Sequence, residues 1–361
     1  MKIKFLVIFI CSGGLFLQAV SQSDSSRKST HVVFPILARS IETGWDVGLV
    51  ASITLKPHKL DTISRTSSAQ ILALYSQYKQ FVAAINGTQY FKNEKYILAE
   101  QISFSSFYDK FWGMGNHSLD KNEESYTYKQ YYTYLHLMRK IAPNFFVGGL
   151  FEFQQLWNIN YLKGGLFDQE SIIGRNGYKV AGMGASVTFD SRNNAFSSNK
   201  GLYAQLYFNH FNSIIGSDEN FTSVVLDCRK YIPITKNNVL ALQLYSFNNI
   251  GTNIPLRSMA SLGGANRMRG YYEGRYSDKQ CFTFQAETRF PVYKRFSMVT
   301  FGGMGAVANQ LRQYSLNDLK LSYGIGARYA INKTEKLNIR VDYGIGNENT
   351  RGFYLQIGEA F

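Results

Sequence analysis

Apolar and polar residues alternate with a period of two over most of the chain, most clearly near its C-terminal end. In residues 337–346 every odd-numbered position is apolar or aromatic, and every even-numbered position is polar, charged or glycine. Residues 319–331 and 282–292 show a similar alternation. A helix would repeat its apolar positions every three to four residues, so this pattern predicts β-strands with two different faces.

The residues on the second face distinguish two kinds of β protein. A soluble sandwich turns that face to water and tends to fill it with Lys and Glu. Here the second face holds Gly, Ser, Asn and Gln with few charges, as the lumen of a membrane barrel does. The alternation also keeps the mean hydropathy near zero, at −0.20. We therefore expect an all-β fold, a transmembrane antiparallel β-barrel.

The alternation delimits fifteen strands after residue 42. They are expected at 43–55, 66–77, 79–90, 94–107, 125–138, 145–158, 178–190, 201–211, 221–232, 238–249, 281–292, 296–308, 319–331, 336–346 and 352–361. A single-chain bacterial barrel with both ends in the periplasm needs an even number, so we expect one further strand between residues 30 and 107, giving 16 strands. The long connections then lie outside the cell, at 108–124, 159–177, 250–280 and 309–318, and the short ones lie in the periplasm.

The N-terminal segment has the features of a secretory signal peptide. Lys2 and Lys4 precede an apolar stretch, and Ala19-Val20-Ser21 is a small-x-small cleavage site. We expect residues 1–21 to be removed near Ser21, residues 22–42 to form a periplasmic lead-in, and residues 43–361 to form the barrel. No later run of about 18 apolar residues could form a membrane helix, so any membrane span is expected to be β.

The composition agrees with a β-barrel and gives little support to other classes. Aromatic residues make up 15% of the chain and charged residues only 18%, which favours strands. The formal net charge is +14, but the sequence shows no basic helix or Lys/Arg stripe, so nucleic-acid binding is not expected. Attraction to anionic glycolipid outside the cell is one reading of the charge. A simple mixture of lumen and loop charges is the reading that we favour.

Candidate residues for catalysis or metal binding are scarce. The five histidines are scattered, and His136 and His210 have no Ser or carboxylate at the spacing of a catalytic triad. No Cys/His cluster suggests a metal site. Cys228 and Cys281 are expected near opposite ends of their strands, too far apart for a disulfide. We expect no enzymatic activity, no metal, no cofactor and free thiols.

The long connection at 250–280 carries the most unusual motif. It contains Ser261-Leu262-Gly263-Gly264-Ala265-Asn266-Arg267-Met268-Arg269-Gly270-Tyr271-Tyr272-Glu273-Gly274-Arg275-Tyr276. The glycines allow tight backbone bends, and the forked guanidinium of arginine can pair with carboxylates. A loop that is merely solvated does not need this combination.

The sequence Gly263-Gly264 followed by Arg269-Gly270-Tyr271 resembles the sixth-extracellular-loop signature of the BamA/TamA superfamily of outer-membrane assembly and secretion barrels, also called the bacterial surface antigen family. The resemblance spans about residues 180–361. Three further stretches agree with it: Phe189-Asp190-Ser191-Arg192-Asn193-Asn194 with Lys200-Gly201, Gln285-Ala286-Glu287-Thr288-Arg289-Phe290-Pro291-Val292, and Gly324-Ile325-Gly326-Ala327-Arg328 with Arg340-Val341-Asp342-Tyr343-Gly344.

The resemblance implies a role for particular residues. In the family the loop arginine folds back into the barrel and pairs with acidic residues of the wall. Arg269 would be that arginine, and Glu287 and Asp342 would be its partners. Where the family's thirteenth strand carries Phe-x-Asp-x-Gly, this chain has Phe301-Gly302-Gly303-Met304-Gly305, so one acid is missing and the network must differ there.

The C-terminal end resembles the signal that the barrel-assembly machinery reads. Phe353, Leu355, Ile357 and Phe361 are expected to share the apolar face of the last strand, with Glu359 interrupting it. The same pattern would also serve as an ordinary last strand, and both readings can hold together.

The resemblance implies a BamA/TamA-type barrel that takes part in outer-membrane protein assembly, insertion or transport. Residues 22–42 are too few for a POTRA domain, so a separate periplasmic POTRA-type partner is possible on this reading. The other expected partners are outer-membrane lipid and glycolipid, and the assembly machinery during biogenesis. Two alternatives stay open: a passive pore for small solutes, and a structural surface-antigen barrel.

Overall fold

The computed structural model describes residues 30–361, except for residues 56–63, 66, 171, 195–196, 333–336 and 348–349. The signal peptide expected at residues 1–21 lies outside the described residues, and so does the beginning of the expected lead-in. Among the residues described, no helix is long and apolar enough to cross a bilayer.

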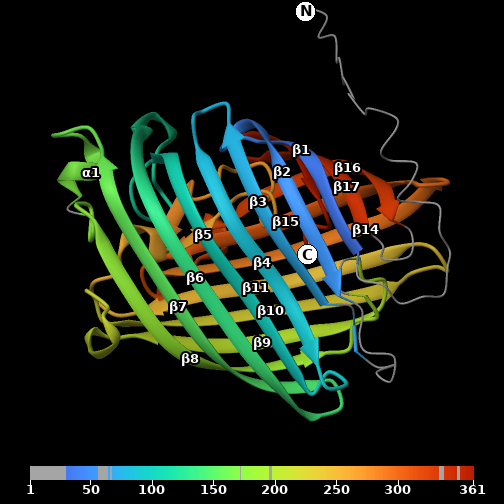
Figure 1. Cartoon of the computed structure of the whole chain (residues 1–361). Coiled ribbons are helices and arrows are strands. Elements are labelled where there is room, and N and C mark those ends of the chain that lie inside the picture. The colour runs from blue at the N-terminus through green and yellow to red at the C-terminus, as the bar shows by residue number, and fades with distance from the viewer. Residues whose placement is uncertain are drawn as a thin grey trace, which may run out of the picture.

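Sixteen strands form a closed antiparallel barrel, as the sequence predicts (Figure 1). The wall strands are β1 (Thr30–Ser40), β2 (Gly44–Leu55), β3 (Ser67–Ser76), β4 (Phe81–Phe91), β5 (Tyr96–Phe111), β6 (Glu124–Ala142), β7 (Phe145–Asn160), β8 (Tyr178–Asp190), β9 (Gly201–Phe211), β10 (Phe221–Pro233), β11 (Val239–Ile250), β14 (Gln280–Tyr293), β15 (Phe296–Ala308), β16 (Lys320–Asn332), β17 (Leu337–Gly346) and β18 (Arg351–Ile357). Each wall strand pairs with its neighbour in the chain, and β1 closes the barrel against β18.

The connections contain the few remaining elements. These are η1 (Asp120–Asn122), α1 (Leu166–Gln169), η2 (Ser213–Ile215), η3 (Leu256–Ser258), η4 (Leu311–Gln313), η5 (Leu316–Asp318), and the short paired strands β12 (Ala260–Leu262) and β13 (Tyr276–Asp278). The long connections gather at one end of the barrel, because successive strands alternate in direction. The end with the long connections is therefore the one expected to face outward.

The missing sixteenth strand is β1, inside the segment that was expected to be a periplasmic lead-in. The boundary expected at residue 42 is therefore wrong, because the barrel wall begins at Thr30. Pro35 hid this strand in the sequence, since proline has no N–H for a strand ladder and argues against a central strand. In the structure β1 adjoins the closing seam of the barrel, where a missing N–H is tolerated.

The period of two separates a lipid face from a lumen face on every strand. Apolar side chains point outward and stay exposed on the isolated molecule, as Leu49 and Ile325 do. Charged side chains of the alternate positions point inward and are buried, as Glu287, Arg328 and Asp342 are. This is the arrangement that a bilayer requires of a barrel wall.

Strand pairing is weakest where the barrel closes. Strands β5 and β6 pair from Tyr96↔Arg139 to Phe111↔Glu124, and β1 pairs with β2 along its whole length. By contrast, β1 and β18 share the single register pair Arg39↔Leu355. The sheet therefore closes into a barrel, but its first and last strands share little backbone hydrogen bonding.

Candidate functional site

The long connection between β11 and β14, residues 251–279, folds into the barrel, and we call it the inward loop. Its strands β12 and β13 pair from Ala260↔Asp278 to Leu262↔Tyr276. Leu262, Met268 and Tyr271 are fully buried. The loop is therefore a packed part of the lumen, as the Gly, Arg and Tyr motif led us to expect.

Glycines allow the loop tip to lie against its neighbours. Gly263 has a φ of +117°, and a Cβ there would lie 2.0 Å from the carbonyl oxygen of Tyr272. Gly270 has a φ of +116°, and a Cβ there would lie 2.8–2.9 Å from main-chain atoms of Ile345 and Gly346 on β17. Any larger residue would hold the tip away from the wall, which explains why the motif needs glycine at these positions.

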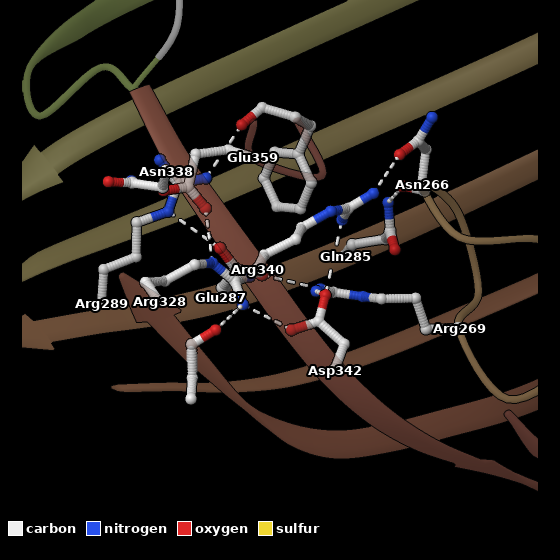
Figure 2. A network of polar contacts seen from close by, with 12 residues as sticks. Asn266, Arg269, Gln285, Glu287, Arg289, Arg328, Asn338, Arg340, Asp342 and Glu359 are labelled. Carbon is white, nitrogen blue, oxygen red and sulfur yellow. Dashed lines mark hydrogen bonds and ion pairs between the residues drawn. The ribbon is translucent and has the colours of Figure 1, made fainter. Parts of the chain in front are cut away.

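Arg269 at the tip makes two ion pairs with the barrel wall (Figure 2). One terminal guanidinium nitrogen donates to Asp342 on β17 and the other to Glu287 on β14, both at 2.8 Å. All three side chains have 0% exposure. The guanidinium carbon also lies 3.5 Å from the ring centre of Phe301. The structure thus brings together the three charged residues that the sequence singled out.

The neighbouring residues fix the tip through further hydrogen bonds. The N–H of Gly270 donates to the Tyr354 hydroxyl at 3.0 Å. The Tyr271 hydroxyl donates to the carbonyl of Leu321 at 2.9 Å and accepts from the N–H of Asn347 at 2.7 Å. The tip is therefore attached to strands β16 to β18 by main-chain contacts as well as by charge. The N–H of Gly264 donates to the Tyr271 carbonyl, which closes the tip on itself.

Three more arginines surround the two acids, and we call the whole set the lock network: Arg269, Arg289, Arg328, Arg340, Glu287, Asp342 and Glu359. Arg289 donates to Glu287 at 2.8 Å, and Arg340 lies 3.4 Å from Asp342. Arg328 contacts Asp342 and Glu287 and also donates to Glu359 at 2.8 Å. The network thus reaches from the loop tip to the last residues of the chain.

The sequence held a signal for two of these arginines. Residues two apart on a strand share a face, so Arg289 has to lie beside Glu287, and Arg340 beside Asp342. Arg328 also lies at a lumen position of its strand. Glu359 had no such signal, because it was expected on the lipid face of a strand that continued to the end of the chain.

The acid missing from β15 leaves a space that the inward loop fills. A Cβ on Gly303 would lie 3.1 Å from the sulfur of Met268. On the same lumen face, β15 contributes the Phe301 ring beneath Arg269. The third carboxylate of the lock network is Glu359, which comes from the C-terminal end and not from β15.

The C-terminal end departs from the expected strand. Strand β18 ends at Ile357, and Gly358 turns the chain with a φ of +92°. Ile357 lies on the exposed face, but Phe361 is buried against Tyr231, Val239 and Ala241 on the lumen side. The expectation that Phe361 closes the apolar face is therefore wrong, because Gly358 redirects the chain into the barrel. Its reading as an assembly signal stays a prediction.

A second anchor holds the inward loop near the outer mouth of the barrel. Asp109 on β5 accepts from Arg257 at 3.2 Å, from the Tyr126 hydroxyl at 3.3 Å and from the Tyr272 hydroxyl at 3.0 Å. Sequence reasoning missed this anchor, because Asp109 lies in a stretch that was expected to be an external connection.

A third contact joins the inward loop to the first hairpin. The side chain of Glu42, in the turn between β1 and β2, accepts from the N–H of Glu273 at 2.9 Å. Burial raises the pKa of Glu42 from its ordinary 4.5 to about 7, and the nearby Glu273 carboxylate adds to the rise. The inward loop thus meets the first hairpin at a carboxylate whose pKa is raised.

In the part of the chain that the structure describes, no three His, Cys, Asp or Glu side chains gather as they would around a metal ion. His136 makes a 2.7 Å hydrogen bond with Ser186, both buried in the lumen. Cys228 and Cys281 are free thiols.

Fold and site together define a membrane β-barrel whose lumen is occupied by an arginine-bearing loop that is ion-paired to the wall. The chain belongs to the Omp85 superfamily, whose domain model matches residues 66–361. It is thus an outer-membrane barrel of the BamA/TamA type, as the loop motif suggested.

Solved structures agree with this fold. BamA from Haemophilus ducreyi lacking POTRA domains 1–3 matches with a TM-score of 0.60 and 13% identity, over 92% of this chain and 70% of that chain. CdiB from Acinetobacter baumannii matches with a TM-score of 0.60 and 11% identity, over 92% and 65%. CdiB from Escherichia coli matches with a TM-score of 0.59 and 9% identity, over 91% and 62%. No curated protein sequence matches this chain.

Proposed function

We propose that this protein takes part in the assembly or insertion of other proteins in the outer membrane. The observation that carries this proposal is the seam, where β1 and β18 share only one register pair. Within the described chain, residues 30–38 of β1 have no partner on that side. Their main-chain N–H and C=O groups form an open strand edge, which is a template for pairing with another strand.

The inward loop has a second part in this proposal. Its tip is tied to β14 and β17, on the C-terminal side of the seam, and its residue Glu273 contacts the β1–β2 turn on the other side. The loop therefore bridges the seam inside the barrel. We expect a seated loop to hold the wall closed, and a released loop to let the seam widen and admit a strand.

We propose a setting for this activity that is consistent with the family. The protein would reach the outer membrane after removal of residues 1–21 and would itself be inserted by the barrel-assembly machinery. A separate periplasmic POTRA-type protein would present clients to the seam. No enzymatic step and no cofactor is needed, because strand exchange breaks and forms only hydrogen bonds.

Depletion followed by quantitative proteomics of the outer membrane tests this proposal. If the protein assembles other barrels, a defined set of them should fall in abundance soon after its own loss, before growth slows. Replacement of Arg269 by Ala should reproduce part of that loss. An outer membrane whose other proteins keep their abundance would contradict an assembly role.

Solute flux separates this function from the passive pore. The inward loop places buried residues inside the lumen, so we expect liposomes that contain the native protein to swell slowly in small sugars. Arg269→Ala should increase the rate, because it frees the loop. Fast swelling that Arg269→Ala leaves unchanged would favour the pore instead.

A further inference from the structure

The last four residues, 358–361, leave the wall and enter the lumen, and we call them the tail. Phe361 and Ala360 pack against Tyr231, Val239 and Ala241 of β10 and β11. Phe361 is 6% exposed. The tail therefore lies across the barrel from the strand that it continues, and it has a packed apolar contact of its own.

Polar contacts fix the tail on its other side. The Glu359 carboxylate accepts from Arg328 at 2.8 Å, from the Asn338 amide at 2.6 Å and from the Ser197 hydroxyl at 3.3 Å. The main-chain oxygen of Phe361 accepts from Arg289 at 2.8 Å. The side chain of Glu359 is 3% exposed, so its charge is held away from bulk water.

The same two arginines also hold the wall acids that bind the inward loop. Arg289 bridges the tail and Glu287, and Arg328 bridges the tail and both wall acids. Figure 2 shows Glu359 joined to Arg328, which in turn reaches the acids that bind Arg269. Tail and loop are therefore neighbours in one charge network, although they enter it from opposite ends of the barrel.

We propose that Glu359 is a positioning residue of the lock network, through which the seating of the tail controls how firmly the inward loop is held. This inference rests on the proposed role of the inward loop and adds a means of regulating it. Anything that draws the tail out of the lumen at the periplasmic end would loosen the loop at the outer end.

The direction of the effect follows from the charges. Four guanidinium groups, Arg269, Arg289, Arg328 and Arg340, face the three carboxylates Glu287, Asp342 and Glu359. Without Glu359, these cations keep Glu287, Asp342 and the Phe361 oxygen that Arg289 binds. A buried cation that loses its partner is costly, so Arg328 turns fully to Asp342 and Glu287. There it competes with Arg269 for the oxygens that hold the loop.

Cys281 reports directly on the seating of the loop. Its thiol is fully buried and donates to the carbonyl of Ser261 on β12, with the sulfur 3.4 Å from that oxygen. A membrane-impermeant maleimide added to the protein in outer-membrane vesicles can reach Cys281 only when the loop lifts.

Cys228 lies on the alternate face of β10 and serves as an internal control for general unfolding. Both rates are read by mass spectrometry of the tryptic peptides.

Glu359→Gln tests the inference, with Glu94→Gln as the matched control. Glu94 is also a periplasmic acid with an arginine partner, Arg65 at 2.9 Å, but it lies outside the lock network. We expect Glu359→Gln to raise the labelling rate of Cys281 by about 3- to 30-fold, a rise that coupling between neighbouring residues can produce. Cys228 should keep its rate, and Glu94→Gln should leave both rates unchanged. Arg269→Ala should raise the Cys281 rate at least as much.

Asn338→Ala is a second test variant, and it changes no charged side chain. It removes a contact of the tail alone, and we expect a rise of about two- to threefold at Cys281. If Glu359→Gln raises the labelling rates of both cysteines, the Asn338→Ala variant is decisive. A higher labelling rate of Cys281 alone in Asn338→Ala supports the inference, and an unchanged rate of Cys281 overturns it.

The remaining outcomes separate this inference from the proposed function. If Arg269→Ala frees Cys281 and Glu359→Gln does not, the tail has no part in holding the loop, and the inference fails alone. If neither variant frees Cys281, ion pairing does not hold the loop, and both the tail and the loop lose their proposed roles. The assembly activity itself is judged separately, by the depletion experiment.

Discussion

The inward loop is held at two places that differ in chemistry. At its tip, Arg269 and its partners Glu287 and Asp342 have no exposed surface, and further arginines crowd around them. Near the mouth, the side chains of Arg257 and Asp109 are 30% and 11% exposed, and two tyrosine hydroxyls complete the site. The first anchor is a buried cluster of opposite charges, and the second is one carboxylate shared by mostly neutral donors near water.

This difference indicates how the loop can be released. A buried ion pair is costly to break by removing one partner, because the other charge stays behind without water. A partly exposed pair is screened by solvent and loses less. We therefore expect the mouth anchor to open at a smaller cost than the tip. A switch between a held and a released inward loop would therefore act at the tip.

The largest effect is expected at the tip. Arg269→Ala removes both buried ion pairs that hold the tip and should destabilise the folded barrel by about 3–5 kcal/mol. Charge reversal, Glu287→Lys or Asp342→Lys, should do the same. The measurement is the temperature at which the compact band of the folded barrel disappears on gels. An unchanged temperature in all three variants would count against the lock network.

A smaller loss is expected at the mouth. Asp109→Asn removes the charge that Arg257 and two tyrosines share, and we expect a cost of about 1–3 kcal/mol. Denaturant titration of the barrel in detergent measures it. Asp218→Asn, at an outer carboxylate that accepts from the N–H of Lys179, is the control and should cost less. A loss at Asp109 equal to that at Arg269 would remove the distinction between the two anchors.

The aromatic ring beneath Arg269 gives a finer test. Phe301→Leu keeps an apolar side chain but removes the face on which the guanidinium lies, 3.5 Å away. We expect a loss of about 0.5–2 kcal/mol, since a desolvated cation–π contact is worth about that much. Phe282→Leu, on the alternate face of β14, is the matched control. Equal losses in the two variants would show that ring volume alone matters.

A different kind of effect, a pH dependence, is expected at the first hairpin. The pKa of Glu42 is about 7 with the loop seated and 4.5 at its ordinary value, so seating takes up a proton between these two pH values. Seating is therefore strongest below about pH 4.5, and it weakens as the pH rises through 7. Glu42→Gln should abolish this dependence.

The pH dependence of loop seating is measured by the labelling rate of Cys281 in the native protein divided by the rate in Glu42→Gln. Ionisation of the thiol affects both rates equally, so it cancels in this ratio. The ratio should rise between pH 5 and pH 8. A constant ratio would show that Glu42 does not titrate with the loop.

Most of the wall could be predicted from the sequence, since alternation along a strand is a local property. It placed fifteen strands and required a sixteenth, and β1 was the one strand not recognised, because Pro35 argues against a strand when the neighbours are unknown. Strands β5 and β7 extend beyond the expected ends towards the outer mouth. That extension carries Asp109 into the wall, where it becomes the second anchor.

The site could be predicted in part. Arg269 was recognisable because its loop motif resembles that of a known family, and Glu287 and Asp342 because they lie at lumen positions on strands that resemble those of the same family. Glu359 was not recognisable, because a strand pattern assigns it to the lipid side. The turn at Gly358 reverses that assignment.

The sequence alone determined which residues face lipid and which face the lumen, because a pleated strand sends successive side chains to opposite sides. Only the tertiary structure decided which lumen residues meet. Arg269 and Asp342, or Asp109 and Tyr272, are far apart along the chain and come together because the barrel closes and the loop and tail enter it from opposite ends. Closure depends on every strand at once, and no single stretch of sequence carries it.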